Sequence, residues 1–390
     1  MATIASSDPI APQPSLPTSP EEALAALDTV RGRTFALVSH LSDEQLTKVL
    51  SPIMSPLVWD LAHIAAYEDL WLAHRYGGRE LLRPDLAELY DAFETPRSVR
   101  GEVQLLDPEQ ARAYLQDVRA QTTDALASRG IGDGTIYELV LRHELQHTET
   151  MRQTLALAGL LPPGEPALAT LDAAEDWVQV PAGAFQMGAA REGFAYDNER
   201  PRHAVEVPAF EIAHRPVSNA SWMSFSESGG YERREWWSDE GWAWKQEQDT
   251  MHHPAIAAGN PHAPACHVSW FEADAFARAA GARLPSEAEW EKAAGKQGVL
   301  AGMGMVWEWT SSRFNGYPGF VAHPYREYSE VFFDGDYRVL RGGSWASDPR
   351  VATLTFRNWD HPLRRQIFAG VRLARDVDPQ GRMRPDGARD

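Results

Sequence analysis

The sequence predicts an α+β protein in which a four-helix bundle precedes a mixed domain rich in irregular structure. Between residues 19 and 161, apolar residues recur at helical spacing in four long segments, which occupy 21–41, 56–77, 108–130 and 135–158. Beyond residue 170 the sequence changes to short apolar runs between many turns. All tryptophans of the chain except Trp59 and Trp71 lie in that second part, which indicates a domain held together by aromatic packing.

Segments of different composition flank these two parts. Residues 1–18 are rich in Pro, Ser and Ala, which predicts a disordered leader. The bundle is then expected over 19–161, and a Pro- and Ala-rich linker over 162–176. The second domain is expected over 177–376, which leaves a tail at 377–390.

Composition excludes several classes of function. The chain has 390 residues and a formal net charge of −18, which argues against a nucleic-acid or anionic-membrane partner, because binding phosphates needs clustered Lys and Arg. No apolar run approaches the roughly 20 residues of a membrane span. The only cysteine is Cys266, so a disulfide framework is excluded and a reducing, cytoplasmic location is expected. These observations predict a protein that handles small molecules, and they do not define its oligomeric state.

The sequence HELQH at 143–147 matches the H-E-x-x-H motif of zinc peptidases. On a helix, His143 and His147 lie one turn apart on the same face, close enough to bind one metal ion. The extended peptidase motif fails, because Thr150 stands where Gly is required and Gln153 where a third His is required. A zinc hydrolase with Glu144 as its base is therefore a remote alternative.

A third ligand is expected from the second helical segment, where His63 lies among apolar neighbours. Three neutral imidazoles would leave about three coordination positions open, a geometry suited to Fe(II) that binds both a substrate and O₂. Glu149 is two positions beyond His147 and points to about the opposite face, so it is not expected to be a ligand. A metal-binding or ligand-binding module without enzymatic activity is a further alternative.

The motifs of the chain resemble those of a known enzyme family. The first half is similar to the DinB-like bundle, and the second half resembles the formylglycine-generating-enzyme (sulfatase-modifying factor) domain, which has a C-type-lectin-like fold. The second resemblance rests on VPAGAFQMG (180–188), HVSWFEADAFARAAGARLPSEAEWEKAA (267–294), VWEWTSS (306–312), RGGSW (341–345) and FAGVRLAR (368–375). This combination of domains resembles the ergothioneine-biosynthesis sulfoxide synthases. The resemblance implies an enzyme that uses Fe(II) and O₂ to join the sulfur of γ-glutamylcysteine to C2 of the imidazole of hercynine.

The same resemblance implies roles for individual residues. It makes His63, His143 and His147 the iron ligands and Tyr325, in PYREYSEVFF, the catalytic tyrosine. Residues 310–365 would supply loops that cover the metal and contact the substrates. The implied substrate-binding residues are Arg97 and Arg100 for the carboxylates of the thiol, Gln146 for the hercynine imidazole, Asn358 and Trp359 for its trimethylammonium and carboxylate end, Asp360 for the thiol substrate, and Tyr328 beside Tyr325.

The chain departs from the family pattern in one segment, and relatives differ in their substrates. Only residues 295–305 connect EWEKAA to VWEWT, where the family has a longer segment. A structural calcium ion is therefore doubtful, and its presence and its absence both stay open as alternatives. The lone Cys266 cannot provide the cysteine pair of formylglycine-generating oxidases. Relatives use γ-glutamylcysteine or free cysteine, and a related branch forms a C–Se bond to make selenoneine, so the thiol or selenium donor stays open.

Overall fold

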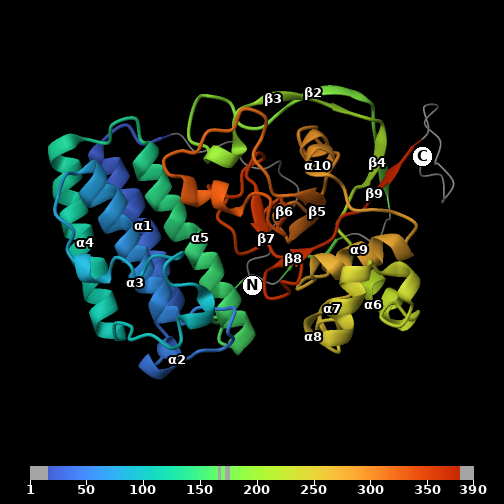
Figure 1. Ribbon diagram of the computed structural model, residues 1–390, viewed down its shortest axis with the longest axis horizontal. Coiled ribbons are helices and arrows are strands. Elements are labelled where there is room, and N and C mark those ends of the chain that lie inside the picture. The colour runs from blue at the N-terminus through green and yellow to red at the C-terminus, as the bar shows by residue number, and fades with distance from the viewer. Residues whose placement is uncertain (1–15, 166–167, 172–175, 378–390) are drawn as a thin grey trace. The chain divides into compact units, whose positions relative to one another are not determined.

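The structure is a computed structural model that describes residues 16–165, 168–171 and 176–377 (Figure 1). Two compact units divide the chain, one ending at Glu165 and the other formed by the residues that follow. The first unit is helical and the second combines sheets with helices, so the predicted α+β class is confirmed. The leader expected at 1–18 and the tail expected at 377–390 fall almost wholly outside the described residues.

The first unit is a bundle of four long helices, which lie side by side in Figure 1. They are α1 (Pro20–Val38), α3 (Leu57–Glu68), α4 (Pro108–Arg129) and α5 (Thr135–Ala158), with a short α2 (Asp43–Thr47) after α1. Local signals set the helix ends. Asp107 and Gln110 form a capping box at the start of α4, which satisfies backbone N–H groups that the first turn leaves free. Left-handed Gly134 and Gly159 flank α5, a conformation that glycine adopts without steric cost.

The second predicted helix changes its hydrogen-bonding pattern partway along. The α-helix α3 ends at Glu68 and continues as a π-helix, η1 (Asp69–Tyr76). Its sequence shows no Pro or Gly that would mark the change. The connection from η1 to α4 contains two short 3₁₀ turns, η2 (Pro84–Leu86) and η3 (Arg97–Val99).

A buried ionic network joins the bundle helices around Arg31 of α1. Its guanidinium pairs with Glu68 of α3 at 2.7 Å and with Glu144 of α5 at 2.9 Å. Arg119 of α4 also pairs with Glu68, at 2.8 Å. Buried charges are stable only when paired and hydrogen-bonded, so this network fixes how the four helices face each other.

The second unit contains three small sheets. One has the strand order β1 (Trp177–Val180), β4 (Phe210–Ala213), β9 (Ala374–Asp376), and the second is the antiparallel pair β2 (Gly183–Met187) and β3 (His203–Val207). The largest has the order β7 (Asn358–Asp360), β6 (Arg338–Arg341), β5 (Trp307–Arg313), β8 (Ala369–Gly370), and β5 pairs parallel only with β8.

Helices and irregular segments surround these sheets. The helices are α6 (Asn219–Glu227), α7 (Asp239–Glu247), α8 (Pro254–Ala258), α9 (Trp270–Ala279) and α10 (Glu287–Ala294). Trp290 of α10 is fully buried and donates its indole N–H to Glu308 of β5 at 2.6 Å. Glu308 also pairs with buried Arg372 at 2.6 Å. Within the described ranges, no helix is long and apolar enough to cross a membrane.

Candidate active site

Helix α5 presents His143 and His147 on one face, one turn apart. The helix covers the stretch that the sequence leaves free of Pro and Gly, so its hydrogen-bond ladder is unbroken through the HELQH motif. The two imidazole rings lie 4.5 Å apart, centroid to centroid. The ring of Tyr67 stacks on that of His143 at 3.6 Å, which restricts the orientation of this imidazole.

Helix α3 brings His63 to the same place. The Nδ1 atom of His63 lies 2.6 Å from the carbonyl oxygen of Tyr90, and because a carbonyl only accepts, Nδ1 must carry the proton. The lone pair of this imidazole is then on Nε2. The ring of Trp59, one turn earlier, stacks on His63 at 4.5 Å. His63 is therefore held at both its Nδ1 atom and its ring face.

A buried carboxylate orients the third imidazole. Asp60 lies on α3 three residues before His63 and is fully buried, and its Oδ1 accepts a hydrogen bond from Nδ1 of His147 at 2.9 Å. A carboxylate in this position fixes the tautomer of a histidine and raises the basicity of its other nitrogen. His147 is thus prepared to donate the Nε2 lone pair to a cation.

The three imidazoles converge closely enough for a metal ion, with their ligand atoms within 4.8 Å of one another. Nε2 of His63 lies 3.1 Å from Nε2 of His143. Two lone pairs at this distance repel unless a proton or a cation lies between them, and neighbouring donor atoms around an octahedral ion at about 2.1 Å are about 3 Å apart. The residues therefore fit a mononuclear metal ion.

Electrostatics also favour the form of these histidines that binds metals. Burial and the nearby imidazole of His147 hold the pKa of His63 well below its usual range. The same two causes, with a contribution from His63, lower the pKa of His143. Both imidazoles are therefore neutral at neutral pH and keep the lone pair that coordination needs.

Glu144, the glutamate of the HELQH motif, has both carboxylate oxygens engaged by residues of α1. Arg31 donates to both of its carboxylate oxygens, at 2.9 and 3.1 Å, and the hydroxyl of Thr34 donates to Oε1 at 2.6 Å. The zinc-hydrolase alternative requires this carboxylate to take a proton from a metal-bound water. Its engagement with α1 argues against that alternative. Glu149 is buried and is outside the group of converging ligand atoms.

The two arginines expected to bind the thiol lie in different environments, although Arg97 begins the short turn η3 and Arg100 directly follows it. Arg97 is exposed. Arg100 is buried, donates to the carbonyl oxygen of Thr95 at 2.8 Å and to the hydroxyl of Ser55 at 2.7 Å, and lies over the ring of Trp59. Burial lowers the pKa of Arg100 to about 9.

The other expected site residues are half-buried. Gln146 lies on α5 next to His147. In the second unit, the rings of Tyr325 and Tyr328 make an edge contact at 6.2 Å, and Tyr328 meets Trp359 at 5.9 Å. Trp359 lies on β7 between Asn358 and Asp360 and stacks on Phe314 at 4.1 Å. The structure thus brings Tyr325, Tyr328 and Trp359 together, while Asn358 and Asp360 are the neighbours of Trp359 along β7.

The sequence prediction missed the groups that support the imidazoles. Asp60 could have been found, because a carboxylate three residues before a histidine in an apolar helix is costly to bury without a partner. The carbonyl group of Tyr90 could not have been found from the sequence. Every residue has a backbone carbonyl, and nothing in the sequence places this one beside His63.

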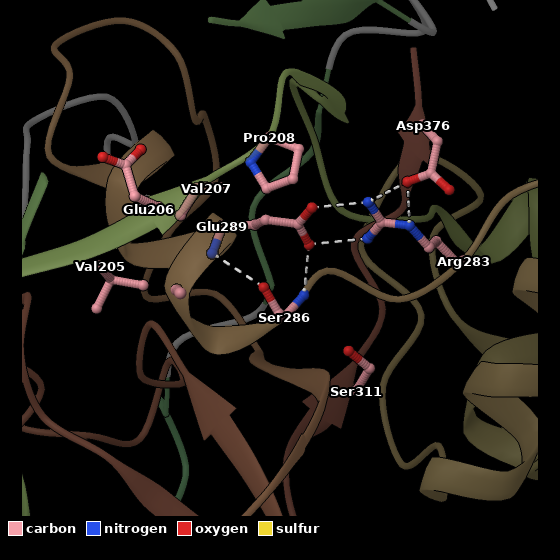
Figure 2. A pocket seen from close by; sticks show the side chains of 10 residues that line it. Val205, Glu206, Val207, Pro208, Arg283, Ser286, Glu289, Ser311 and Asp376 are labelled. Carbon is pink, nitrogen blue, oxygen red and sulfur yellow. Dashed lines mark hydrogen bonds and ion pairs between the residues drawn. The ribbon is translucent and has the colours of Figure 1, made fainter. Parts of the chain in front are cut away.

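A surface pocket of about 390 Å³ lies elsewhere in the second unit (Figure 2). Arg283 lines it and is held by Glu289 at 2.7 Å and by Asp376 at 2.6 Å. None of the expected site residues lines this pocket, and the charge of its arginine is compensated by the two carboxylates.

Two family models match the chain and agree with this architecture. The DinB superfamily model matches residues 26–151, and the sulfatase-modifying factor enzyme 1-like domain matches 164–302 and 296–377. Fold and site together define a class of two-domain proteins in which a DinB bundle carries a three-histidine cluster and a sulfatase-modifying-factor domain follows it.

Similar proteins identify the family within that class. The hercynine oxygenase of Mycobacterium tuberculosis is 41% identical, and the alignment covers 92% of this chain and all of the relative. The hercynine oxygenase of Mycolicibacterium smegmatis is also 41% identical, over 90% of this chain and 98% of that protein. Ergothioneine biosynthesis protein 1 of Schizosaccharomyces pombe is 23% identical, over 93% of this chain and 57% of that longer protein. The chain belongs to the hercynine oxygenase family and is an oxygenase, which confirms the family predicted from the motifs.

Proposed function

We propose that the protein is a non-haem Fe(II), O₂-dependent sulfoxide synthase of ergothioneine biosynthesis. It joins the sulfur of γ-glutamylcysteine, or of free cysteine, to C2 of the hercynine imidazole. The observation that supports this most directly is the cluster of His63, His143 and His147, with two Nδ1 atoms engaged, in a chain that aligns with hercynine oxygenases over almost its whole length.

The reaction balances with O₂ as the only oxidant. The S–H bond of the thiol and the C2–H bond of hercynine break, and a C–S bond and an S=O bond form. The two substrates lose four electrons in total, O₂ accepts them, and its second oxygen atom leaves as water. When bound, the iron supplies the one-electron chemistry that activates O₂ and stabilises the thiolate over the thiol.

The residues of the chain bind the substrates and move the proton. Arg97 and Arg100 are assigned to the carboxylates of the thiol, because guanidinium groups bind carboxylates through paired, charge-assisted hydrogen bonds. Trp359 offers an aromatic face to the trimethylammonium group. Tyr325 supplies a phenolic proton as O₂ is reduced, which directs the oxidation towards the C–S bond. The remaining contacts are assigned to Gln146 and Asn358 for hercynine, and to Asp360 and Tyr328 beside the thiol.

Metal analysis and a turnover assay test this proposal together. Protein purified without O₂ should contain one iron per chain. It should consume O₂ only when hercynine and a suitable thiol are both present, and mass spectrometry should detect the sulfoxide. Parallel assays with γ-glutamylcysteine, cysteine and a selenium donor identify the second substrate. Purified zinc protein with hydrolytic activity and no O₂ uptake would overturn the proposal.

A further inference from the structure

The segment that carries Tyr325 has little regular structure of its own. It runs from His323 through two 3₁₀ turns, η6 (Arg326–Tyr328) and η7 (Glu330–Phe332). Turns of three residues contribute few backbone hydrogen bonds, so the position of Tyr325 depends on contacts with other parts of the second unit.

Several of those contacts come from one distant turn, η4 (Asp197–Glu199), and the tyrosine before it. The fully buried hydroxyl of Ser329 donates to Oδ1 of Asp197 at 2.5 Å and accepts from the side-chain amide of Asn198 at 2.9 Å. The backbone N–H of His323 donates to the other oxygen of Asp197 at 3.3 Å. The ring of Tyr196 stacks on that of Tyr328 at 4.4 Å.

These contacts fall on both sides of Tyr325, two residues before it and three and four residues after it. Asp197, Asn198 and Ser329 are all buried, and a buried carboxylate is tolerated only when hydrogen bonds replace its water. Burial raises the pKa of Asp197 to about 6, and the hydrogen bonds from Ser329 and from the backbone of His323 oppose this rise. Burial of the Asp197 carboxylate is therefore costly in free energy unless Ser329 and His323 stay in place to donate their hydrogen bonds to it.

We propose that Asp197, acting through Ser329, is a positioning residue that sets where the Tyr325 hydroxyl lies during the reaction. The inference rests on the proposed role of Tyr325 as proton donor. Asp197 and Ser329 touch no reacting atom in this account. They restrict the backbone on both sides of Tyr325, so that its phenol meets the reacting oxygen at the required angle and distance.

The test removes one hydroxyl and follows the products. In Ser329→Ala, iron content and the KM values for both substrates should stay within about 3-fold of the wild type, while kcat for sulfoxide falls by about 10- to 100-fold. Oxygen should then be diverted to the thiol alone, giving the sulfinic acid, which takes up both atoms of one O₂. A matched control is Thr355→Val, which removes another hydroxyl bound to the same turn, at Glu199 Oε2, 2.5 Å away. The control should keep the wild-type ratio of products.

Ser329→Ala combined with Tyr325→Phe separates a loss of Tyr325 positioning from a general disturbance of the fold. If Ser329 acts through Tyr325, Ser329→Ala adds no further change in the product ratio once the phenol is absent. An equal further shift in the Tyr325→Phe protein, or the same shift in Thr355→Val, overturns the inference. If Tyr325→Phe itself leaves the product ratio unchanged, the proposed proton donor is wrong. If Tyr325→Phe changes the ratio and Ser329→Ala does not, only the positioning role is wrong.

Discussion

At the scale of single residues, the buried carboxylate of Asp60 is hydrogen-bonded to His147, a candidate metal ligand. Asp60→Asn keeps the shape of the side chain and removes the charge that raises the basicity of His147, so we expect Fe(II) affinity to fall by about 10- to 100-fold. Anaerobic Fe(II) titration measures this, and His147→Ala should abolish binding. Glu149→Gln is the control and should bind iron like the wild type. Equal affinities in Asp60→Asn and the control would show that the carboxylate does not tune the ligand.

The different burial of Arg97 and Arg100 gives a second prediction. Both alanine variants should raise KM for the thiol by about 10- to 100-fold and leave KM for hercynine little changed. Arg100→Ala should also lower the free energy of unfolding by about 1–3 kcal/mol, because it leaves the Thr95 carbonyl and the Ser55 hydroxyl without their donor.

Steady-state kinetics and urea unfolding of both variants separate these effects. A stability loss in Arg100→Ala with an unchanged KM for the thiol would assign this arginine to the packing of Trp59 alone. If the KM for the thiol were also unchanged in Arg97→Ala, neither arginine would bind the thiol.

At the scale of the element, the sequence predicted the helices well and their interruptions poorly. The helix α5 was predictable because two glycines bound 24 residues without Pro or Gly. The change from α3 to the π-helix η1, in which Trp71 and Leu72 are buried, has no Pro or Gly in the sequence to mark it. The His face followed from the spacing of HELQH, whereas the role of Glu144 followed only from Arg31, 113 residues away. Spacing indicates which residues share a face, and only the fold shows what that face meets.

The ionic network between helices predicts an acid sensitivity of the bundle. Arg31 and Arg119 outweigh the cost of burial and hold the pKa of Glu68 at about 2, below the ordinary value of 4.5. A lowered pKa stabilises the fold above the unfolded-state value, and this stabilisation is lost as the pH falls from about 4.5 through about 2. Since one pKa unit corresponds to about 1.4 kcal/mol, the loss should reach about 3 kcal/mol.

Urea unfolding of metal-free protein, followed by circular dichroism between pH 6 and pH 2, measures this loss. Glu68→Gln should be less stable at pH 6 and should show a smaller decrease in unfolding free energy with acid than the wild type. Glu102→Gln, at an exposed position, should follow the wild-type curve. Parallel curves for all three proteins would mean that other carboxylates control acid unfolding.

At the scale of the whole molecule, the candidate metal ligands all belong to the first of the two units. The converging ligand atoms come from α3 and α5, so a metal ion bound by them would join two helices of the first unit. A ligand that binds only the folded state stabilises it by about 2.7 kcal/mol at 100 times its Kd. That stabilisation should be concentrated in the elements that the metal connects.

Hydrogen exchange with and without Fe(II), measured by mass spectrometry in the absence of O₂, tests this distribution. We expect Fe(II) to slow exchange in α3 and α5 by about 10-fold or more, because the metal opposes the local opening that separates these helices. Strands β5 to β8 of the second unit should exchange at the same rate in both states. Protein with His63→Ala should show no protection in either unit, which separates site binding from nonspecific metal association. Protection confined to the second unit would place the metal outside the three-histidine cluster and would contradict the ligand assignment.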